Sequence, residues 1–241
     1  MKEVNVLILG GAGYVGGCVT DALIKKSIPF TVYDNLTYEP HYLKPVNFIL
    51  GDVRDTEKLK KILPEYTHVI HLAAIVGEGA CNARPDLTRE INQNSVKWLA
   101  ENFSGRIIFT STCSVYGNQE ISSGGEAIDE SRIPAPLSLY GETKVAAEKY
   151  LENKNALILR LGTLFGLGDH FSRPRLDLAG NQMPIAANSK GYLEVYGGGV
   201  QWRPFIHVKD VGEIIAKAVL ADTTGIHNIG AINITIGDLA K

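Results

Sequence analysis

The fold is decided near the amino terminus by Val4-Asn5-Val6-Leu7-Ile8-Leu9-Gly10-Gly11-Ala12-Gly13-Tyr14-Val15-Gly16. An apolar run over residues 4–9 is typical of a buried strand, and residues 15–26 have the spacing of a helix. Between them, glycines stand at every third position: Gly10, Gly13 and Gly16. They allow a tight turn, bring a pyrophosphate close to bare backbone N–H groups and leave the positive end of the helix dipole facing it. The stretch therefore predicts a dinucleotide-binding strand–turn–helix.

An acidic residue follows at the spacing that such a site requires. Residues 30–33 are typical of a second strand, and Asp34 ends it about 20 residues beyond the turn. Its carboxylate can accept hydrogen bonds from both ribose hydroxyls and would repel a 2′-phosphate, so NAD is favoured over NADP. The alternative is an ordinary strand-to-helix turn, and the coincidence of strand, turn, helix and Asp34 weighs against it.

Composition restricts the class of protein. The 241 residues are 45% hydrophobic and 21% charged, which excludes a disordered chain and suits one large domain or one with an appendage. The net charge is −2 without a block of Lys or Arg, so nucleic acid is not expected as a partner. No apolar run approaches the roughly 20 residues of a membrane span, and a cytoplasmic location is expected. Three cysteines without CxxC spacing predict free thiols and no metal site: Cys18, Cys81 and Cys113.

Short apolar runs alternate with helical segments through the first two thirds of the chain. Further strands are expected at residues 47–50, 68–72, 106–110 and 156–160, and helices at residues 56–63, 87–102 and 139–151. This alternation predicts an α/β fold, a Rossmann-type doubly wound parallel sheet, over residues 1–165.

The remaining residues, 166–241, are expected to form a small C-terminal substrate-binding lobe, interleaved with the last sheet strand and helix. Residues 166–199 suit loops and a short helix, residues 205–208 a strand and residues 211–221 a helix. A surface loop is expected at residues 118–136, which are rich in Ser, Gly, Glu and Pro.

Tyr140 and Lys144 stand at i and i+4, on one face of the expected helix. A nearby ammonium and a positively charged nicotinamide ring would both favour the phenolate of Tyr140, which makes this side chain a candidate proton acceptor. The same spacing is common on solvated helix faces. The hydroxyl-rich run at residues 110–117 lies where open α/β sheets bind their ligands, although it also suits an ordinary turn. Cys113 lacks an orienting base and is assigned to packing.

Six motifs in order resemble the extended short-chain dehydrogenase/reductases, in particular their nucleotide-sugar epimerase/dehydratase branch. They are residues 10–16, 33–36, 51–53, 71–74, 112–117 and 140–144. The resemblance implies NAD as cofactor, a nucleotide-diphosphate sugar as substrate, and a homodimer formed through helices around residues 88–102 and 140–152.

The resemblance also implies roles for individual residues. The catalytic set would be Thr112, Tyr140 and Lys144. Cofactor contacts would come from Gly10, Gly13, Tyr14, Val15, Gly16, Asp34, Asn35, Asp52, Val53, Leu72, Ala73, Ala74, Asn92, Thr110, Tyr140 and Lys144. The substrate would be bound by Thr112, Asn181, Tyr196 and Arg203. Arg203 also suits phosphate on chemical grounds, because its planar fork makes paired charged hydrogen bonds.

Two departures from the family pattern bear on the reaction. Cys113 and Ser114 stand where the 4,6-dehydratases carry an Asp and a Glu, so an epimerase acting by transient C4 oxidation is expected rather than a dehydratase. The chain stops at Lys241, before family members usually end, so the substrate lobe is expected to be shortened. A reductase or decarboxylase of the same family, and a non-catalytic dinucleotide-binding protein, are the alternatives.

Overall fold

The computed structural model describes residues 3–117 and 128–241. The loop expected at residues 118–136 therefore lies partly outside the described residues. Its described part, residues 128–136, contains neither helix nor strand.

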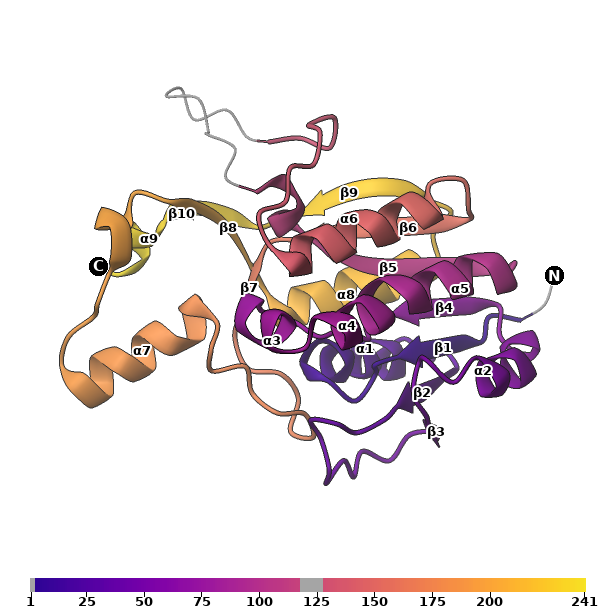
Figure 1. Cartoon of the computed structure of the whole chain (residues 1–241). Helices are drawn as coiled ribbons and strands as arrows, with labels where there is room; N and C mark the ends of the chain where they lie inside the picture. The colour runs from indigo at the N-terminus through magenta and orange to yellow at the C-terminus, as the bar shows by residue number, and fades with distance from the viewer. Residues whose placement is uncertain (1–2, 118–127) are drawn as a thin grey trace.

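Seven parallel strands form the central sheet, in the order β3-β2-β1-β4-β5-β6-β9 (Figure 1). They are β1 (Val6–Leu9), β2 (Phe30–Asp34), β3 (Phe48–Leu50), β4 (His68–His71), β5 (Arg106–Thr112), β6 (Ala156–Leu161) and β9 (Gly225–Ile229). The chain leaves β1 toward β2 on one side and reaches β4 on the other, so the strand order reverses beside β1. Ligands of open α/β sheets bind at the carboxyl ends of the strands at such a point. The predicted Rossmann-type sheet is confirmed.

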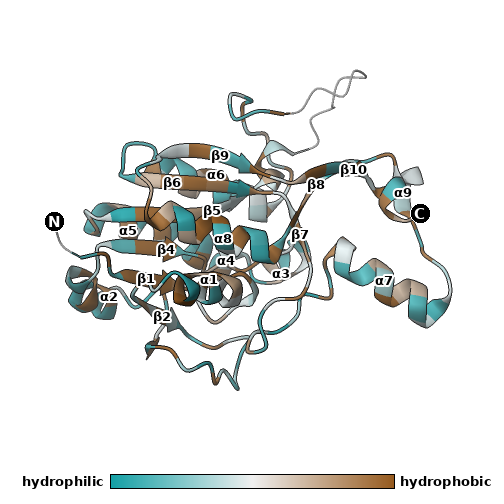
Figure 2. Ribbon diagram, turned by 180° about the vertical axis from the view of Figure 1, so that it is seen from behind, coloured by the Kyte–Doolittle hydropathy of each residue, from teal (hydrophilic) through white to brown (hydrophobic). Residues whose placement is uncertain are grey.

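Helices cover both faces of this sheet. One face packs on α1 (Tyr14–Lys25) and α8 (Val208–Val219), and the other on α2 (Thr56–Ile62), α5 (Ser95–Asn102) and α6 (Leu139–Leu151). Shorter helical segments are η1 (Leu63–Glu65), α3 (Glu78–Ala83), α4 (Pro85–Arg89), η2 (Glu90–Asn94) and η3 (Cys113–Tyr116). The apolar strands lie between the two helical layers (Figure 2), and Leu7, Ile8 and Phe109 are fully buried.

A second, three-stranded sheet with its own helices lies beyond the carboxyl edge of the first (Figure 1). It contains β7 (Thr163–Phe165), β8 (Trp202–His207) and β10 (Ile232–Thr235), accompanied by α7 (Ala179–Lys190), η4 (Tyr196–Gly199) and α9 (Ile236–Leu239). Residues 166–207 and 230–241 are called the lobe below. Helix α7 and the α9 end stand apart from the sheet in both views, and α7 buries none of its residues.

The structure corrects three expectations for the C-terminal third. The expected strand at residues 205–208 ends at His207, because the Nδ1 atom of His207 accepts from the backbone N–H of Lys209 at 3.2 Å and caps α8, which starts at Val208. That strand also belongs to the small sheet; the last strand of the main sheet is β9, whose His227 and Asn228 hide the apolar pattern. Helix α7 has 12 residues around Pro184, where loops and only a short helix were expected.

Across the described residues, no helix combines the length and the hydropathy that a bilayer crossing would need.

Candidate functional site

The glycine turn forms a backbone cradle at the carboxyl end of β1. Gly10 has φ +81°, and a Cβ on it would lie 2.5 Å from the backbone nitrogen of Ala73. Gly16 approaches the carbonyl of Gly11 so closely that it has no room for a side chain. Helix α1 begins at Tyr14, and its N-cap, Gly13, supplies no side-chain hydrogen bond to the first turn. The N–H groups at this helix start therefore face outward for an anion, and the residues fit a pyrophosphate.

Asp34 lies beside this cradle. Its carboxylate accepts from the backbone N–H of Ala12 at 3.1 Å and from that of Leu36 at 2.8 Å. Burial raises its pKa from the ordinary value, while these backbone hydrogen bonds act in the opposite direction. The acid is thus fixed against the glycine turn, where the first ribose of a dinucleotide would lie.

Asp52 and Asn35 lie just beyond the carboxyl ends of β3 and β2, and their side chains bind each other. The Nδ2 group of Asn35 donates to Asp52 Oδ2 at 2.9 Å, and Arg54 binds both carboxylate oxygens of Asp52 at 2.9 Å. The hydrogen bonds from Arg54 hold the pKa of Asp52 at about 2. Val53 beside it is buried. Asp52 therefore stays charged, and its side chain is fixed by Asn35 and Arg54.

The chain after β4 forms the inner wall of the groove. The N–H groups of Leu72 and Ala73 both donate to the Leu9 carbonyl, at 2.8 and 2.9 Å. Asn92 lies in the π-helical turn η2, and its side-chain amide makes two hydrogen bonds with the backbone of Ile75. Its Oδ1 accepts from the Ile75 N–H and its Nδ2 donates to the Ile75 carbonyl, each at 2.8 Å. The structure thus gives Asn92 a supporting contact to the segment after Ala74.

Lys144 is buried on α6, with 2% of its surface exposed. Its ammonium donates to the Thr110 carbonyl at 2.7 Å and lies 6.0 Å from the centre of the Tyr140 ring. Burial lowers its pKa to about 8, and the Glu148 charge opposes that shift. The predicted Tyr140 and Lys144 pair is therefore on the inward face of α6, next to the end of β5.

Tyr140 lies among Thr112, two thiols and one arginine. Burial raises the pKa of its phenol, and the nearby thiols Cys113 and Cys81 act in the same direction. The charge of Arg175 and a hydrogen bond with Thr112 lower the pKa. A phenolate at this position therefore depends on positive charge around it.

Arg175 is the residue at this site that the sequence analysis missed. It forms a two-pronged ion pair with Asp177, with both N–O distances 2.7 Å, and its charge acts on both Tyr140 and Tyr14. Its segment was expected to be an undefined loop, and no spacing in the sequence connects it to Tyr140. Tyr14 itself joins the cradle to this segment, since its hydroxyl donates to the Gly166 carbonyl at 2.6 Å.

The three lobe residues expected to contact the substrate, Asn181, Tyr196 and Arg203, lie in different surroundings. Arg203 is exposed on β8, where its Nη1 donates to the Trp202 carbonyl at 3.1 Å, and its charge lowers the pKa of the Cys113 thiol against the larger raising effect of burial. Asn181 uses its side chain on backbone groups of Gly166 and Arg175. Tyr196 is 79% exposed, and its hydroxyl contacts Glu194. Of these three residues, Arg203 acts by its charge on Cys113, the residue that follows Thr112.

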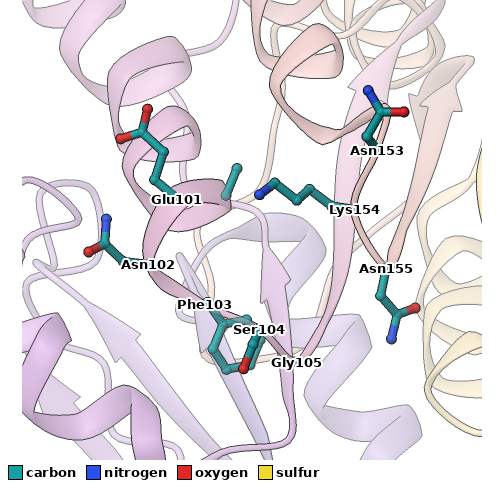
Figure 3. Close-up of a pocket in the computed structure, with 9 residues that line it drawn as sticks. Glu101, Asn102, Phe103, Ser104, Gly105, Asn153, Lys154 and Asn155 are labelled. Atoms are coloured by element: carbon teal, nitrogen blue, oxygen red, sulfur yellow. The ribbon is translucent and has the colours of Figure 1, made fainter.

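A polar hollow lies at the opposite edge of the main sheet, away from these residues (Figure 3). It is lined by the end of α5 and by the segments that enter β5 and β6, including Glu101, Phe103 and Lys154. It faces the amino ends of the strands and is separate from the cofactor groove. Within residues 3–117 and 128–241, no three His, Cys, Asp or Glu side chains are grouped to hold a metal ion.

Comparisons with known proteins agree with this geometry. Residues 6–234 match the model of the NAD dependent epimerase/dehydratase family. The chain is 28% identical to UDP-glucose 4-epimerase 3 of Oryza sativa subsp. japonica, over 97% of this chain and 71% of that protein.

Solved structures give a similar result. The UDP-glucose 4-epimerase of Thermus thermophilus in complex with NAD matches with a TM-score of 0.81 at 27% identity, over 98% of this chain and 81% of that one. The dTDP-glucose 4,6-dehydratase DesIV of Streptomyces venezuelae has a TM-score of 0.83 at 22% identity, over 98% of this chain and 79% of that one, which shows a shared fold alone.

Proposed function

The chain belongs to the NAD-dependent epimerase/dehydratase family, and from this premise we propose that it is a 4-epimerase of a nucleotide-diphosphate sugar. NAD is its cofactor, which confirms the prediction made from the glycine turn and Asp34. The observation that carries the proposal is the cluster formed by Thr112, Tyr140 and Lys144. Cys113 and Ser114 stand beside it, at the positions where a dehydratase needs a second acid and base.

Each of these side chains has a task in the proposed reaction. Tyr140 as phenolate takes the proton from the sugar C4 hydroxyl, and the phenol later returns it. Thr112 hydrogen-bonds the phenol and shares that proton. The glycine turn and Asp34 would hold NAD, which would supply a reversible hydride acceptor for C4, with the hydride returning to the other face of a 4-keto sugar. No net oxidation results, because the proton and the hydride both return.

Of the charges around the phenol, that of Arg175 favours this proton transfer, while the pKa of Tyr140 is raised overall. Burial alone disfavours the phenolate, and Arg175 supplies the positive charge that opposes burial. Lys144 is held by the Thr110 carbonyl, in a position to bind the nicotinamide ribose. Arg203, at the entrance, is suited to a diphosphate oxygen.

We also propose which part of the chain binds each ligand, and that the protein is a homodimer. The main sheet with its helices holds NAD, and the lobe with β7 binds the sugar nucleotide. Two copies associate through the outer faces of the α4–α5 and α6 segments, which light scattering would test: a dimer mass at micromolar concentration is expected.

The test of the proposed reaction is incubation with UDP-glucose and NAD, followed by NMR for the C4 epimer. Tyr140→Phe is expected to lower turnover by at least about 100-fold, because it removes the general base, while NAD stays bound. Unchanged turnover would refute the role of Tyr140.

The same assay separates the other reactions. Net consumption of NADH would indicate a reductase, and release of carbon dioxide from UDP-glucuronate a decarboxylase. Bound NAD without any change in several donor sugars would indicate a non-catalytic dinucleotide-binding protein.

A further inference from the structure

A row of buried charges continues from Tyr140 into the protein along α6. Tyr140, Lys144 and Glu148 are each one helical turn apart, so they share the face that packs on β5 and β6. Glu148 is 3% exposed, as buried as Lys144. The proposed reaction uses Tyr140 and Lys144 and leaves this third buried group without a task.

Both oxygens of the Glu148 carboxylate are engaged. Arg160, on β6, donates from Nη2 to Oε2 at 2.7 Å and from Nε to Oε1 at 3.1 Å. The Ser111 hydroxyl also donates to Oε1. Because Ser111 precedes Thr112 in β5, the carboxylate joins the helix that carries Tyr140 and Lys144 to the strand end that carries Thr112.

The other end of Arg160 fixes the turn that follows Thr112. Its Nη1 donates to the Tyr116 hydroxyl at 2.8 Å, and the guanidinium carbon lies 4.9 Å from the centre of that ring. The Tyr116 hydroxyl in turn donates to Asn228 Oδ1 on β9 at 2.7 Å. Glu148 and Arg160 thus lie at the centre of a buried connection among α6, β5, η3 and β9.

The charge of Glu148 also acts on Lys144, whose ammonium lies in a poorly solvated site. Three other titratable groups face Lys144: the Tyr140 phenol, the Cys81 thiol on α3 and the His71 imidazole on β4. The uncharged Phe109 ring also lies 4.5 Å from the ammonium. Burial raises the pKa of Cys81 and lowers that of His71 to about 3, so both are neutral at pH 7. The exposed pair Arg89 and Glu142 lies on the outer side of α4 and α6. Among the described groups that face Lys144, Glu148 alone is negatively charged at pH 7.

We propose that Glu148, fixed by Arg160 and Ser111, is a positioning residue that holds the Lys144 ammonium and the Thr112 end of β5 in place around Tyr140. It acts through Lys144 and Ser111, not on the sugar. The inference rests on the proposed function for the tasks of Tyr140, Lys144 and Thr112. The effect of the Glu148 charge on Lys144 is independent of the reaction.

The test is an NMR titration of the full-length protein with ¹³Cε-labelled lysine, with the Lys144 signal assigned from Lys144→Arg. Glu148→Gln removes the negative charge, so the ammonium loses its proton more easily and the Lys144 midpoint falls by about one pH unit or more. Glu142→Gln, with the same change on the exposed side of the same helix, is the matched control and leaves the midpoint unchanged. If the enzyme is active, the alkaline limb of the kcat profile moves to lower pH with the midpoint.

Glu148→Gln leaves Arg160 buried without its partner, so the double variant Glu148→Gln/Arg160→Gln keeps the test valid if the single variant does not fold. Replacing both members of a buried ion pair is far less costly than removing one. The Lys144 midpoint is expected to fall here as well, because the negative charge of Glu148 raises the pKa of Lys144. A wild-type midpoint in a folded variant of either kind overturns the proposal. No NAD or sugar is added, so failure here is distinct from failure to epimerise UDP-glucose.

Discussion

The main sheet and the lobe are built in opposite ways. In the main sheet, each central strand is buried between helices on two faces, and the interior strands Val6–Leu9 and Arg106–Thr112 are buried at every residue. In the lobe, α7 buries no residue, and large apolar side chains such as Ile185, Tyr192 and Tyr196 are exposed. The part proposed to hold NAD is therefore stabilised by its own core, whereas the part proposed to bind the sugar buries few of its own residues and depends on contacts with that core.

Those contacts are identifiable. The Tyr14 hydroxyl binds the Gly166 carbonyl, and Lys44 contacts Asp169 at 2.7 Å. The lobe residues Ile206 and Leu178 also pack against apolar residues of α1 and α8, so the polar contacts add to a small shared core. Single substitutions at the polar contacts can separate the stability and the ligand of the lobe from those of the main sheet. The following three predictions test that difference, beginning with the largest effect.

Lys44→Met is expected to weaken the attachment of the lobe to the main sheet, because the Lys44 ammonium binds Asp169 of the lobe. The side chains of Lys44 and Asp169 are each only 3% exposed, and the ammonium also lies 2.6 Å from Asp21. Without it, Asp169 keeps a buried charge without its cation, so the free energy of unfolding should fall by about 3–5 kcal/mol. Urea denaturation measures this. Lys25→Met, at an exposed pair with Glu213, should change it by less than about 0.5 kcal/mol, and equal losses in the two variants would contradict the expectation.

Arg203→Ala tests whether the lobe can lose affinity for its ligand while the main sheet keeps its own. Charged hydrogen bonds to a phosphate contribute about 1.5–3 kcal/mol, so the KM for a UDP-sugar should rise about 10- to 100-fold while NAD affinity is unchanged. Steady-state kinetics and NAD titration give the two numbers. Lys217→Ala, an exposed cation on α8, serves as the control. Parallel weakening of NAD and sugar would show that the two regions are not separable.

Arg54→Ala is expected to have the smallest effect, because it removes the exposed partner of Asp52 in the main domain. The pKa of Asp52 is depressed to about 2, so its pairing stabilises the fold above the unfolded value of about 3.9, and that contribution is lost as pH falls through about 2. Arg54 is 44% exposed, so the loss at neutral pH should be below about 1 kcal/mol and vanish near pH 2. Unfolding free energies between pH 7 and 2 test this, with the exposed Lys60→Ala as control; a difference that persists at pH 2 would exclude this pair as its source.

The predictions from sequence succeeded where a local pattern corresponds to a local structure. The run from Val4 to Gly16 gave the first strand, the turn and α1, and the spacing of Tyr140 and Lys144 gave their shared face on α6. They failed at β9 and α7. The Gly225–Ile229 strand contains polar residues because it lies at the edge of the sheet and is only partly buried, and α7 forms around Pro184 without burying a face that periodicity could detect.

Sequence by itself determined the Rossmann-type sheet, the glycine cradle and the acid beside it, because neighbours along the chain and the period of apolar residues specify these features. Tertiary structure alone decided what surrounds Tyr140. Arg175 and Cys81 act on it from segments whose separation along the chain carries no signal. The charge state of a buried side chain depends on the groups that packing brings near it and on the water that packing excludes, and neither is encoded in local spacing.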